Sequence, residues 1–160
     1  TWVAWVKEDV AAPAAAGAIV SKRGLESDNT GWYLGQDGGS AYRVSVTQSV
    51  ATASRYSGTV PATGRWYHVA GVYDASAQTL DIYVNGALDN GTLSGTVPSS
   101  QSNSGLNANI GRKPVNNSYE DGLIDEVRIY NRALSQSEIT ELYRLGAARM
   151  KINTPITQRG

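Results

Sequence analysis

The sequence lacks cysteine and contains a single histidine, His68. Without cysteine the chain cannot form a disulfide, a thiol nucleophile or a Cys-based zinc site. One histidine also excludes a metal site built from a cluster of histidines. Lys plus Arg and Asp plus Glu each number 14, so the formal net charge is zero. This balance argues against the broad positive field with which proteins bind nucleic acids or anionic membranes.

Long apolar runs are lacking as well. No stretch approaches the ~20 residues that a helix needs to cross a bilayer. No signal peptide precedes the first run of strand-forming residues, Thr1 to Lys7. The 160 residues suffice for one domain with a hydrophobic core. We therefore expect a single domain that is part of a longer protein.

Short strands separated by Gly-rich turns make up most of the chain. Trp66 to Tyr73 and Thr79 to Val84 predict a hairpin, and Asn85-Gly86 after them matches a type I′ turn. Trp32 to Gly35 and Ala41 to Val46 predict a second hairpin. Further short strands are expected over residues 18–22, 108–111 and 123–130, and residues 89–107 are expected to form a long connection. Many short strands of this kind predict an all-β sandwich or barrel.

One helix is expected near the C-terminus. Ser135 to Glu138 forms a capping box, in which the Ser hydroxyl and the Glu carboxylate each accept a backbone N–H at the helix start. Ile139, Leu142 and Tyr143 form an apolar stripe, and Gly146 predicts the helix end. The domain is therefore expected over residues 1–146, with residues 147–160 as a linker or tail.

Three stretches share a further pattern. They are Trp2 to Lys7, the hairpin from Gly64 to Asp74 with Leu80 to Gly86, and Asp121 to Ser135 with the helix that follows. These stretches resemble the laminin-G-like domains of the concanavalin A-like lectin/glucanase superfamily. The likeness extends from Thr1 to Gly146, and its last stretch is the most specific.

The resemblance implies a two-sheet antiparallel jelly-roll sandwich with one short C-terminal helix. Such modules occur in tandem in secreted or cell-surface proteins and bind glycans or other proteins, often with one calcium ion. The resemblance also implies one or two further strands before the position of Thr1, one of which can supply a metal ligand. It makes Asp125 a calcium ligand. Because calcium takes six to eight oxygens, Asp125 would need help from nearby loops, and the alternative is an Asp that only accepts loop N–H groups.

Several side chains are candidates for contact with a sugar. Exposed aromatic rings stack on sugar rings, and cations pair with a sugar carboxylate or sulfate. Asp81 is expected on the same strand face as Tyr83, which would place a carboxylate beside an aromatic platform. The alternative is that these residues are packed rim residues and solvated charges, with Trp5, Trp66 and His68 serving the core. The candidates are Tyr33, Tyr42, Tyr83, Tyr119, Asp81, Arg43, Lys22 and Arg128.

The acidic residues do not form a catalytic pattern. A retaining glycosidase needs two carboxyls about 5–5.5 Å apart on one surface, whereas adjacent strand residues point to opposite faces. The adjacent pairs are Glu8-Asp9, Glu120-Asp121 and Asp125-Glu126, and Asp125 is expected to share a face with Val127. A buried carboxylate pair would instead favour a degenerate hydrolase.

We therefore predict a non-catalytic carbohydrate-binding or adhesion module of a larger secreted or cell-surface protein. Its partner would be a glycan or polysaccharide. The alternative is a structural or protein-protein interaction module that acts as a spacer in a tandem array.

Overall fold

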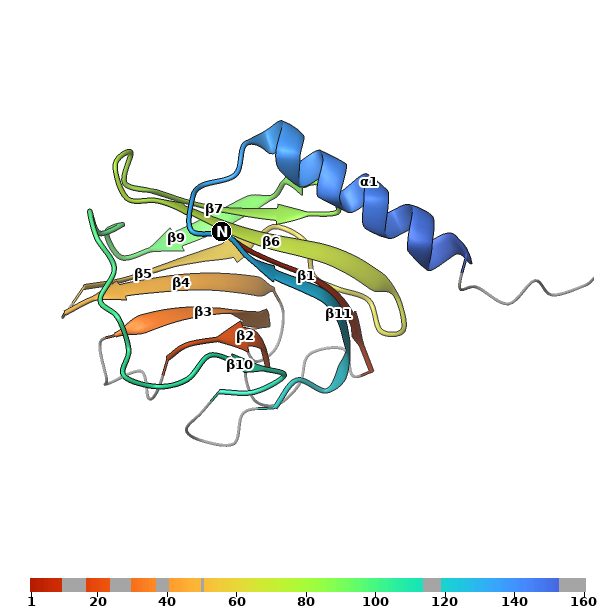
Figure 1. Ribbon diagram of the computed structural model, residues 1–160, viewed down its shortest axis with the longest axis horizontal. Coiled ribbons are helices and arrows are strands. Elements are labelled where there is room, and N and C mark those ends of the chain that lie inside the picture. The colour runs from red at the N-terminus through yellow and green to blue at the C-terminus, as the bar shows by residue number, and fades with distance from the viewer. Residues whose placement is uncertain (10–16, 24–29, 37–40, 50, 114–118, 153–160) are drawn as a thin grey trace, which may run out of the picture.

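The computed structural model describes residues 1–9, 17–23, 30–36, 41–49, 51–113 and 119–152. These residues form two antiparallel sheets stacked face to face, with one helix across the outer face of the first sheet (Figure 1). The first sheet has the order β11 (Gly122–Ile129), β1 (Trp2–Glu8), β6 (Trp66–Asp74), β7 (Thr79–Val84) and β8 (Ala87–Leu88). The second has the order β10 (Asn109–Ile110), β2 (Ala18–Ser21), β3 (Gly31–Gln36), β4 (Tyr42–Gln48), β5 (Ala51–Ser57) and β9 (Asn90–Ser94). The predicted all-β sandwich with one C-terminal helix, α1 (Gln136–Ile152), is confirmed.

Alternation along the strands builds the core between the sheets. On β7, the residues Leu80, Ile82 and Val84 all pack inward, as their shared face predicted. Every second residue of β1, β3 and β4 joins them in one cluster. Each fully buried aliphatic or aromatic side chain of this kind contributes roughly 1.5–3 kcal/mol to the free energy of unfolding.

The two predicted hairpins are present. Asn85 and Gly86 both have positive φ, 51° and 79°, as a type I′ turn requires. The turn of the other hairpin, residues 37–40, lies outside the described residues. The long connection over residues 89–107 contains a strand that sequence reasoning missed, β9, because the Asn and Gly at its start are depleted in strands and the segment is short.

Strand β11 contains a bulge that the sequence did not indicate. Trp5 of β1 pairs with Asp125, and Val3 pairs with Arg128, so the register shifts between these two pairs. Glu126, which lies within the shift, has a positive φ of 48°. Ile124 and Val127 both pack on the core, so two residues lie between inward positions instead of one. The expectation that Asp125 and Val127 share a face is therefore wrong, because strict alternation fails at a bulge.

The helix docks on the outer face of the first sheet. Leu134 and Ile139 pack on Val3, Ala70, Val72 and Tyr83 in a second apolar cluster. The predicted capping box is present, since Glu138 Oε2 accepts the Ser135 N–H at 2.9 Å and Ser135 Oγ accepts the Glu138 N–H at 3.4 Å. Arg132 and then Ser135 lower the pKa of Glu138 to about 2 by hydrogen bonding to its carboxylate.

Gly146 does not end the helix, which continues to Ile152. Gly146 instead allows the helix to approach Trp5 closely, because a Cβ at this position would overlap Nε1 of the Trp5 indole. Trp5 in turn stacks on Tyr143, with ring centroids 5.7 Å apart. The glycine therefore lets the helix lie against the first sheet. Residues 147–152 are helical, and residues 153–160 lie outside the described part of the chain.

Replacing Gly146 with Ala tests this packing. In an isolated helix the change would stabilise the helix by about 1 kcal/mol, because Ala has a higher helix propensity than Gly. Against Trp5 we expect destabilisation of about 1–3 kcal/mol, because the added methyl overpacks a filled interface. Urea unfolding followed by circular dichroism measures the difference. Gly105→Ala is the matched control, since nothing lies within 4 Å of a Cβ there; a stabilising Gly146→Ala would contradict the docking.

A second prediction concerns His68, which is 1% exposed and packs against the rings of both Trp5 and Tyr143. Burial, and then the charge of Arg128, lower the pKa of His68 to about 4. Folding therefore favours neutral His68, and this stability is present above pH ~6.5 and is lost as the pH falls towards 4. Between pH 6.5 and pH 4 we expect the free energy of unfolding of the wild type to fall by about 3 kcal/mol more than that of His68→Phe. Equal losses in urea unfolding at both pH values would contradict a buried neutral imidazole.

Candidate functional site

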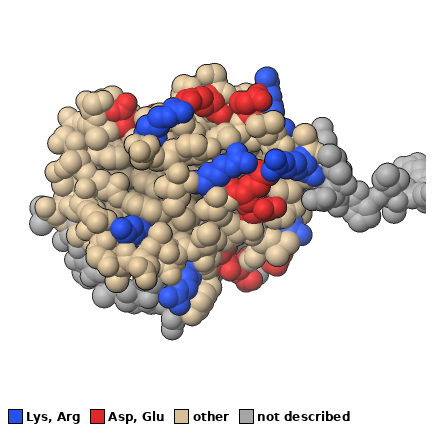
Figure 2. All heavy atoms as spheres, in the orientation of Figure 1, with Lys and Arg blue, Asp and Glu red and all other residues tan. Residues whose placement is uncertain are grey.

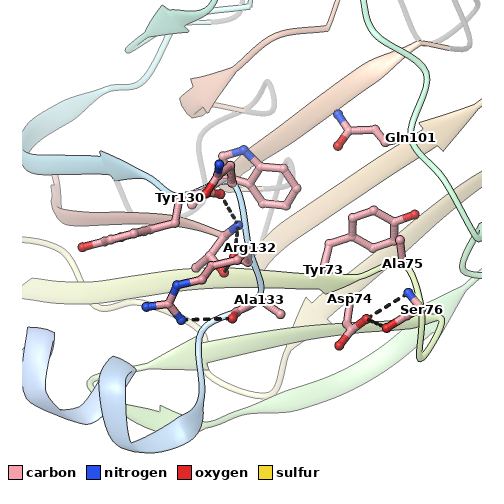
Figure 3. Close-up of a pocket in the computed structure, with 11 residues that line it drawn as sticks. Tyr73, Asp74, Ala75, Ser76, Gln101, Tyr130, Arg132 and Ala133 are labelled. Carbon is pink, nitrogen blue, oxygen red and sulfur yellow. Dashed lines mark hydrogen bonds between the residues drawn. The ribbon is translucent and has the colours of Figure 1, made fainter.

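A groove of about 470 Å³ opens at the end of the sandwich where β1 begins and where β6 and β11 end. In Figure 3, Tyr130 and Arg132 lie on one side of the groove, with Tyr73, Ala75 and Ser76 on the other. Its volume lies within the range of small-ligand sites, ~300–1,000 Å³. The lining residues are Thr1, Trp2, Tyr73, Asp74, Ala75, Ser76, Gln101, Tyr130, Asn131, Arg132 and Ala133.

One wall is the turn between β6 and β7. Asp74 Oδ1 accepts hydrogen bonds from the N–H and hydroxyl of Ser76, at 2.9 and 2.6 Å, and from the N–H of Ala77 at 3.0 Å. These bonds hold the pKa of the Asp74 carboxyl below its usual value, so the group is ionised at neutral pH. The Tyr73 hydroxyl donates to the Pro98 carbonyl at 2.7 Å and fixes the ring. The turn therefore presents a positioned aromatic ring beside a carboxylate.

The opposite wall is the segment that leaves β11. The Arg132 guanidinium donates to both carboxylate oxygens of Glu138, at 3.0 and 2.5 Å, and is thereby held at the groove edge. The ring of Tyr130 is partly buried against the second apolar cluster. Trp2 is 4% exposed and packs on Trp32 with ring centroids 5.1 Å apart, so its indole belongs to the floor of the groove.

The lining of the groove is mixed in chemical character. Rings and short polar side chains surround one carboxylate, and the described lining residues bring neither a histidine nor a second carboxyl to pair with Asp74. Glycoside hydrolysis by acid and base requires two carboxyl groups. The groove can therefore hold a polar ligand, and the residues described there do not supply a hydrolytic pair.

Two carboxyl groups do meet elsewhere, inside the sandwich. Glu8, at the end of β1, is fully buried, and its carboxyl lies against that of Glu120, which precedes β11. Carboxyls in direct contact are closer than the ~5–5.5 Å of a retaining glycosidase. Sequence reasoning missed this pair because it compared only neighbouring acids. Alternation would have placed Glu8 inward, with Trp2, Ala4 and Val6.

Two of the predicted sugar contacts, Tyr33 and Arg43, are buried together. Tyr33 is fully buried on β3, and its hydroxyl donates to the Gln36 carbonyl at 2.8 Å. The Arg43 guanidinium lies 4.9 Å from the centre of the Tyr33 ring and is 8% exposed overall. Tyr42 is also fully buried. The structure therefore joins Tyr33 and Arg43 by a cation-π contact, and their role towards a sugar stays a prediction.

The other predicted contacts lie apart from the groove. Tyr83 is 7% exposed because α1 covers its face of β7, which the sequence did not indicate. Asp81 Oδ1 accepts a hydrogen bond from Asn90 at 2.7 Å. Tyr119 is 55% exposed, in an isolated bridge with Arg112. Tyr119 is thus the one of these predicted residues whose ring has a large exposed area.

The predicted calcium ligand, Asp125, lies exposed at the β11 bulge, and its Oδ1 accepts the Glu126 N–H at 2.7 Å. Among the described residues, no group of three or more His, Asp or Glu side chains gathers around it or elsewhere. That geometry fits the alternative, an Asp that accepts a backbone N–H. Calcium at Asp125 would need further oxygens from outside this set.

The charges are mixed in sign. Figure 2 shows Lys and Arg beside Asp and Glu near α1 and β11, with large uncharged areas between them. In this region Glu126 pairs with Arg128 at 3.1 Å and with Arg149 at 2.7 Å. Among the described residues, we find no helix that is both long and apolar enough to span a membrane. The visible face thus carries paired charges rather than a field of one sign.

Comparison with known proteins agrees with the two-sheet fold. Residues 1–140 match the laminin G family described as the concanavalin A-like lectin/glucanases superfamily. No curated protein shows a significant match to the sequence. The fold is similar to that of a candidate carbohydrate-binding protein from Bacteroides ovatus, with a TM-score of 0.66 and 21% identity over 88% of this chain. This chain spans only 39% of the length of that protein.

Two further solved structures are similar. One is the CBM40 module of the Ruminococcus gnavus IT-sialidase bound to α2,3-sialyllactose, with a TM-score of 0.64, 15% identity, and coverage of 89% of this chain and 80% of that one. The other is the heptameric SAP-like pentraxin from Limulus polyphemus, with a TM-score of 0.64, 15% identity, and coverage of 89% and 68%. At these identities the similarity establishes the fold and nothing further.

Proposed function

We propose, because the chain belongs to the concanavalin A-like lectin/glucanases superfamily, that it is a non-catalytic carbohydrate-binding module of a larger secreted or cell-surface protein. The observation that carries the proposal is the groove between Tyr73 and Tyr130. Two of the similar structures, from Bacteroides ovatus and Ruminococcus gnavus, are described as a candidate carbohydrate-binding protein and as a module bound to a sialylated sugar. They support the proposal by analogy of fold.

The groove combines the two contacts that sugars use. The C–H face of a sugar ring packs on an aromatic ring, and Tyr73 is held for such a contact by its hydrogen bond to the Pro98 carbonyl. Sugar hydroxyls both donate and accept, and the side chains of Asp74, Gln101 and Asn131 offer acceptors and donors around the same space. A volume of about 470 Å³ suits one or two sugar units.

A protein-interaction or spacer module is the second candidate. The edge strands carry exposed apolar side chains: Leu123 and Ile129 on β11, with exposures of 50% and 52%, and Ile110 on β10, with 61%. A sheet edge can recruit a strand from another chain. This candidate would use the edges of the sandwich and leave the groove free.

Calcium at Asp125 is part of the proposal in a structural role. Asp125 lies on an edge strand beside the chain segment that enters from Asp121. The ion would stabilise that segment, with oxygens supplied from outside the described side chains. Such a role predicts glycan binding that weakens in EDTA and in Asp125→Asn.

A glycan array, run with calcium and with EDTA, tests the function. We expect retention of at least one polysaccharide or oligosaccharide by the wild-type chain. The double variant Gln101→Ala/Asn131→Ala should weaken retention by about tenfold or more, because it removes polar contacts of the groove. Circular dichroism should show an unchanged fold.

Tyr119→Ala is the matched comparison, since Tyr119 is exposed, does not line the groove and was predicted independently as a sugar contact. Weakened binding by the double variant together with equal binding by Tyr119→Ala and the wild type would support a site in the groove. Loss in Tyr119→Ala alone would move the site to Tyr119. Absence of glycan binding in both buffers would contradict carbohydrate binding and favour the protein-interaction candidate.

A further inference from the structure

The interior of the sandwich becomes polar at the end opposite the groove. Four side chains lie there: Glu8 at the end of β1, Gln36 at the end of β3, Tyr42 at the start of β4, and Glu120 before β11. Glu8, Gln36 and Tyr42 are each fully buried. Each occupies an inward position, since Val6, Leu34 and Val44 two residues away belong to the core.

The polar atoms of this cluster lack partners. Among the described residues, no hydrogen-bond partner is present for these atoms: both carboxylate oxygens of Glu8 and of Glu120, both amide atoms of Gln36, and the Tyr42 hydroxyl. The Glu8 carboxyl lies against the Glu120 carboxyl. Buried polar groups without partners are costly and rare, and they call for a physical explanation.

The charges around Glu8 and Glu120 further disfavour an ionised carboxyl pair without a counter-ion. The charged groups that act on Glu8 are Glu120, Asp121 and Asp9, all of them acidic. Burial first, and then the neighbouring Glu120 carboxyl, raise the pKa of Glu8 far above its usual range. Burial, and then the charges of Glu8 and Glu120, raise the pKa of the Tyr42 hydroxyl. No cation of the described residues is among the charged groups that act on Glu8.

The backbone holds the two carboxyls in place. On one side the Glu8 carbonyl accepts the Gly64 N–H at 2.8 Å, and the Asp9 N–H donates to the Asp121 carbonyl at 3.0 Å. On the other side the Glu120 N–H donates to the Gly111 carbonyl at 2.9 Å. Gly17 faces Glu120, where any side chain would overlap the carboxylate. The convergence is therefore built by five separate segments of the chain, at residues 8–9, 17, 64, 111 and 120–121.

We propose that a divalent cation, calcium by the chemistry of the ligands, binds between Glu8 and Glu120 with the Gln36 amide oxygen as a third ligand. Two carboxylates balance the charge of the ion and can offer four oxygens, and an amide oxygen is a further ligand of the hard type that calcium prefers. The remaining positions would go to water or to backbone carbonyls. Gln36 is the independent indication, since its amide is fully buried and has no partner among the described residues. Its backbone pairs with Tyr42, and its N–H donates at 3.0 Å to the carbonyl of Gly17, the residue that faces Glu120.

This site is separate from the calcium expected at Asp125, which lies exposed on β11, and it does not depend on glycan binding. An ion here would link β1, β3 and the segment before β11. The sequence offered no sign of it, because its ligands lie 28 and 84 residues apart along the chain (from 8 to 36 and from 36 to 120).

Isothermal titration of the chelator-treated full chain with CaCl₂ at neutral pH tests the site, together with thermal unfolding with and without calcium. We expect binding by the wild type and an increase in Tm with calcium. Glu8→Gln and Glu120→Gln should each weaken binding at this site by at least tenfold. Both variants should fold as well as the calcium-free wild type or better, because an amide removes the clash of the two carboxyls.

Asp125→Asn is the matched control, and it should retain this binding. Calcium binding that is lost in Asp125→Asn and kept in Glu8→Gln would overturn the proposal. A second result would also overturn it: the wild type shows neither heat of binding nor a Tm increase at millimolar calcium, and Glu8→Gln is more stable than the wild type at pH 8. In that case the two carboxyls would only share a proton. Failure of the glycan array leaves each of these readings unchanged, so the two proposals fail separately.

Discussion

The placement of β1 in the middle of the first sheet is the constraint on which the other features depend. The strand pairs with β6 on one side and with β11 on the other, so its backbone is hydrogen-bonded along both edges. Its even-numbered residues enter the core, while Val3 and Trp5 face α1. A strand buried on both faces must be apolar almost throughout, and Trp2 to Val6 meets that requirement. The groove lies where this strand begins, and the buried carboxyl pair lies where it ends.

The two ends of the sandwich differ in how their polar groups are satisfied. At the groove, Asp74 accepts three hydrogen bonds from its own turn and Arg132 is paired with Glu138. These groups are stable without a ligand and are positioned to meet one, which is the arrangement of a preformed binding site. At the other end, Glu8 and Glu120 have only each other. Burial strengthens the interaction of such a pair with a bound cation and makes a charged pair without a counter-ion costly.

The helix shows how tertiary packing changes the meaning of a local signal. The capping box predicts the helix start correctly, because its hydrogen bonds involve residues within one turn. Gly146 has the local signature of a helix end, yet its reason is contact with Trp5, a residue more than a hundred positions earlier. The same docking buries Tyr83, which the alternation of β7 placed beside Asp81 without indicating what would cover that face. The bulge at Asp125 and Glu126 likewise depends on pairing with β1 rather than on β11 alone.

The sequence by itself determined the elements whose interactions are local: the β6–β7 hairpin, the Asn85-Gly86 turn, the inward face of β7 and the start of α1. Turn geometry, side-chain alternation and capping each act over a few residues, so a single sequence is enough to predict them. Only the tertiary structure decided the groove, the burial of Tyr33, Arg43 and Tyr83, and the meeting of Glu8 with Glu120. The groove and the Glu8–Glu120 contact result from strands that pair across 60 to 130 residues, such as β1 with β6 and with β11, and Tyr83 is buried by the docking of α1. No local pattern encodes which distant side chains such contacts bring together.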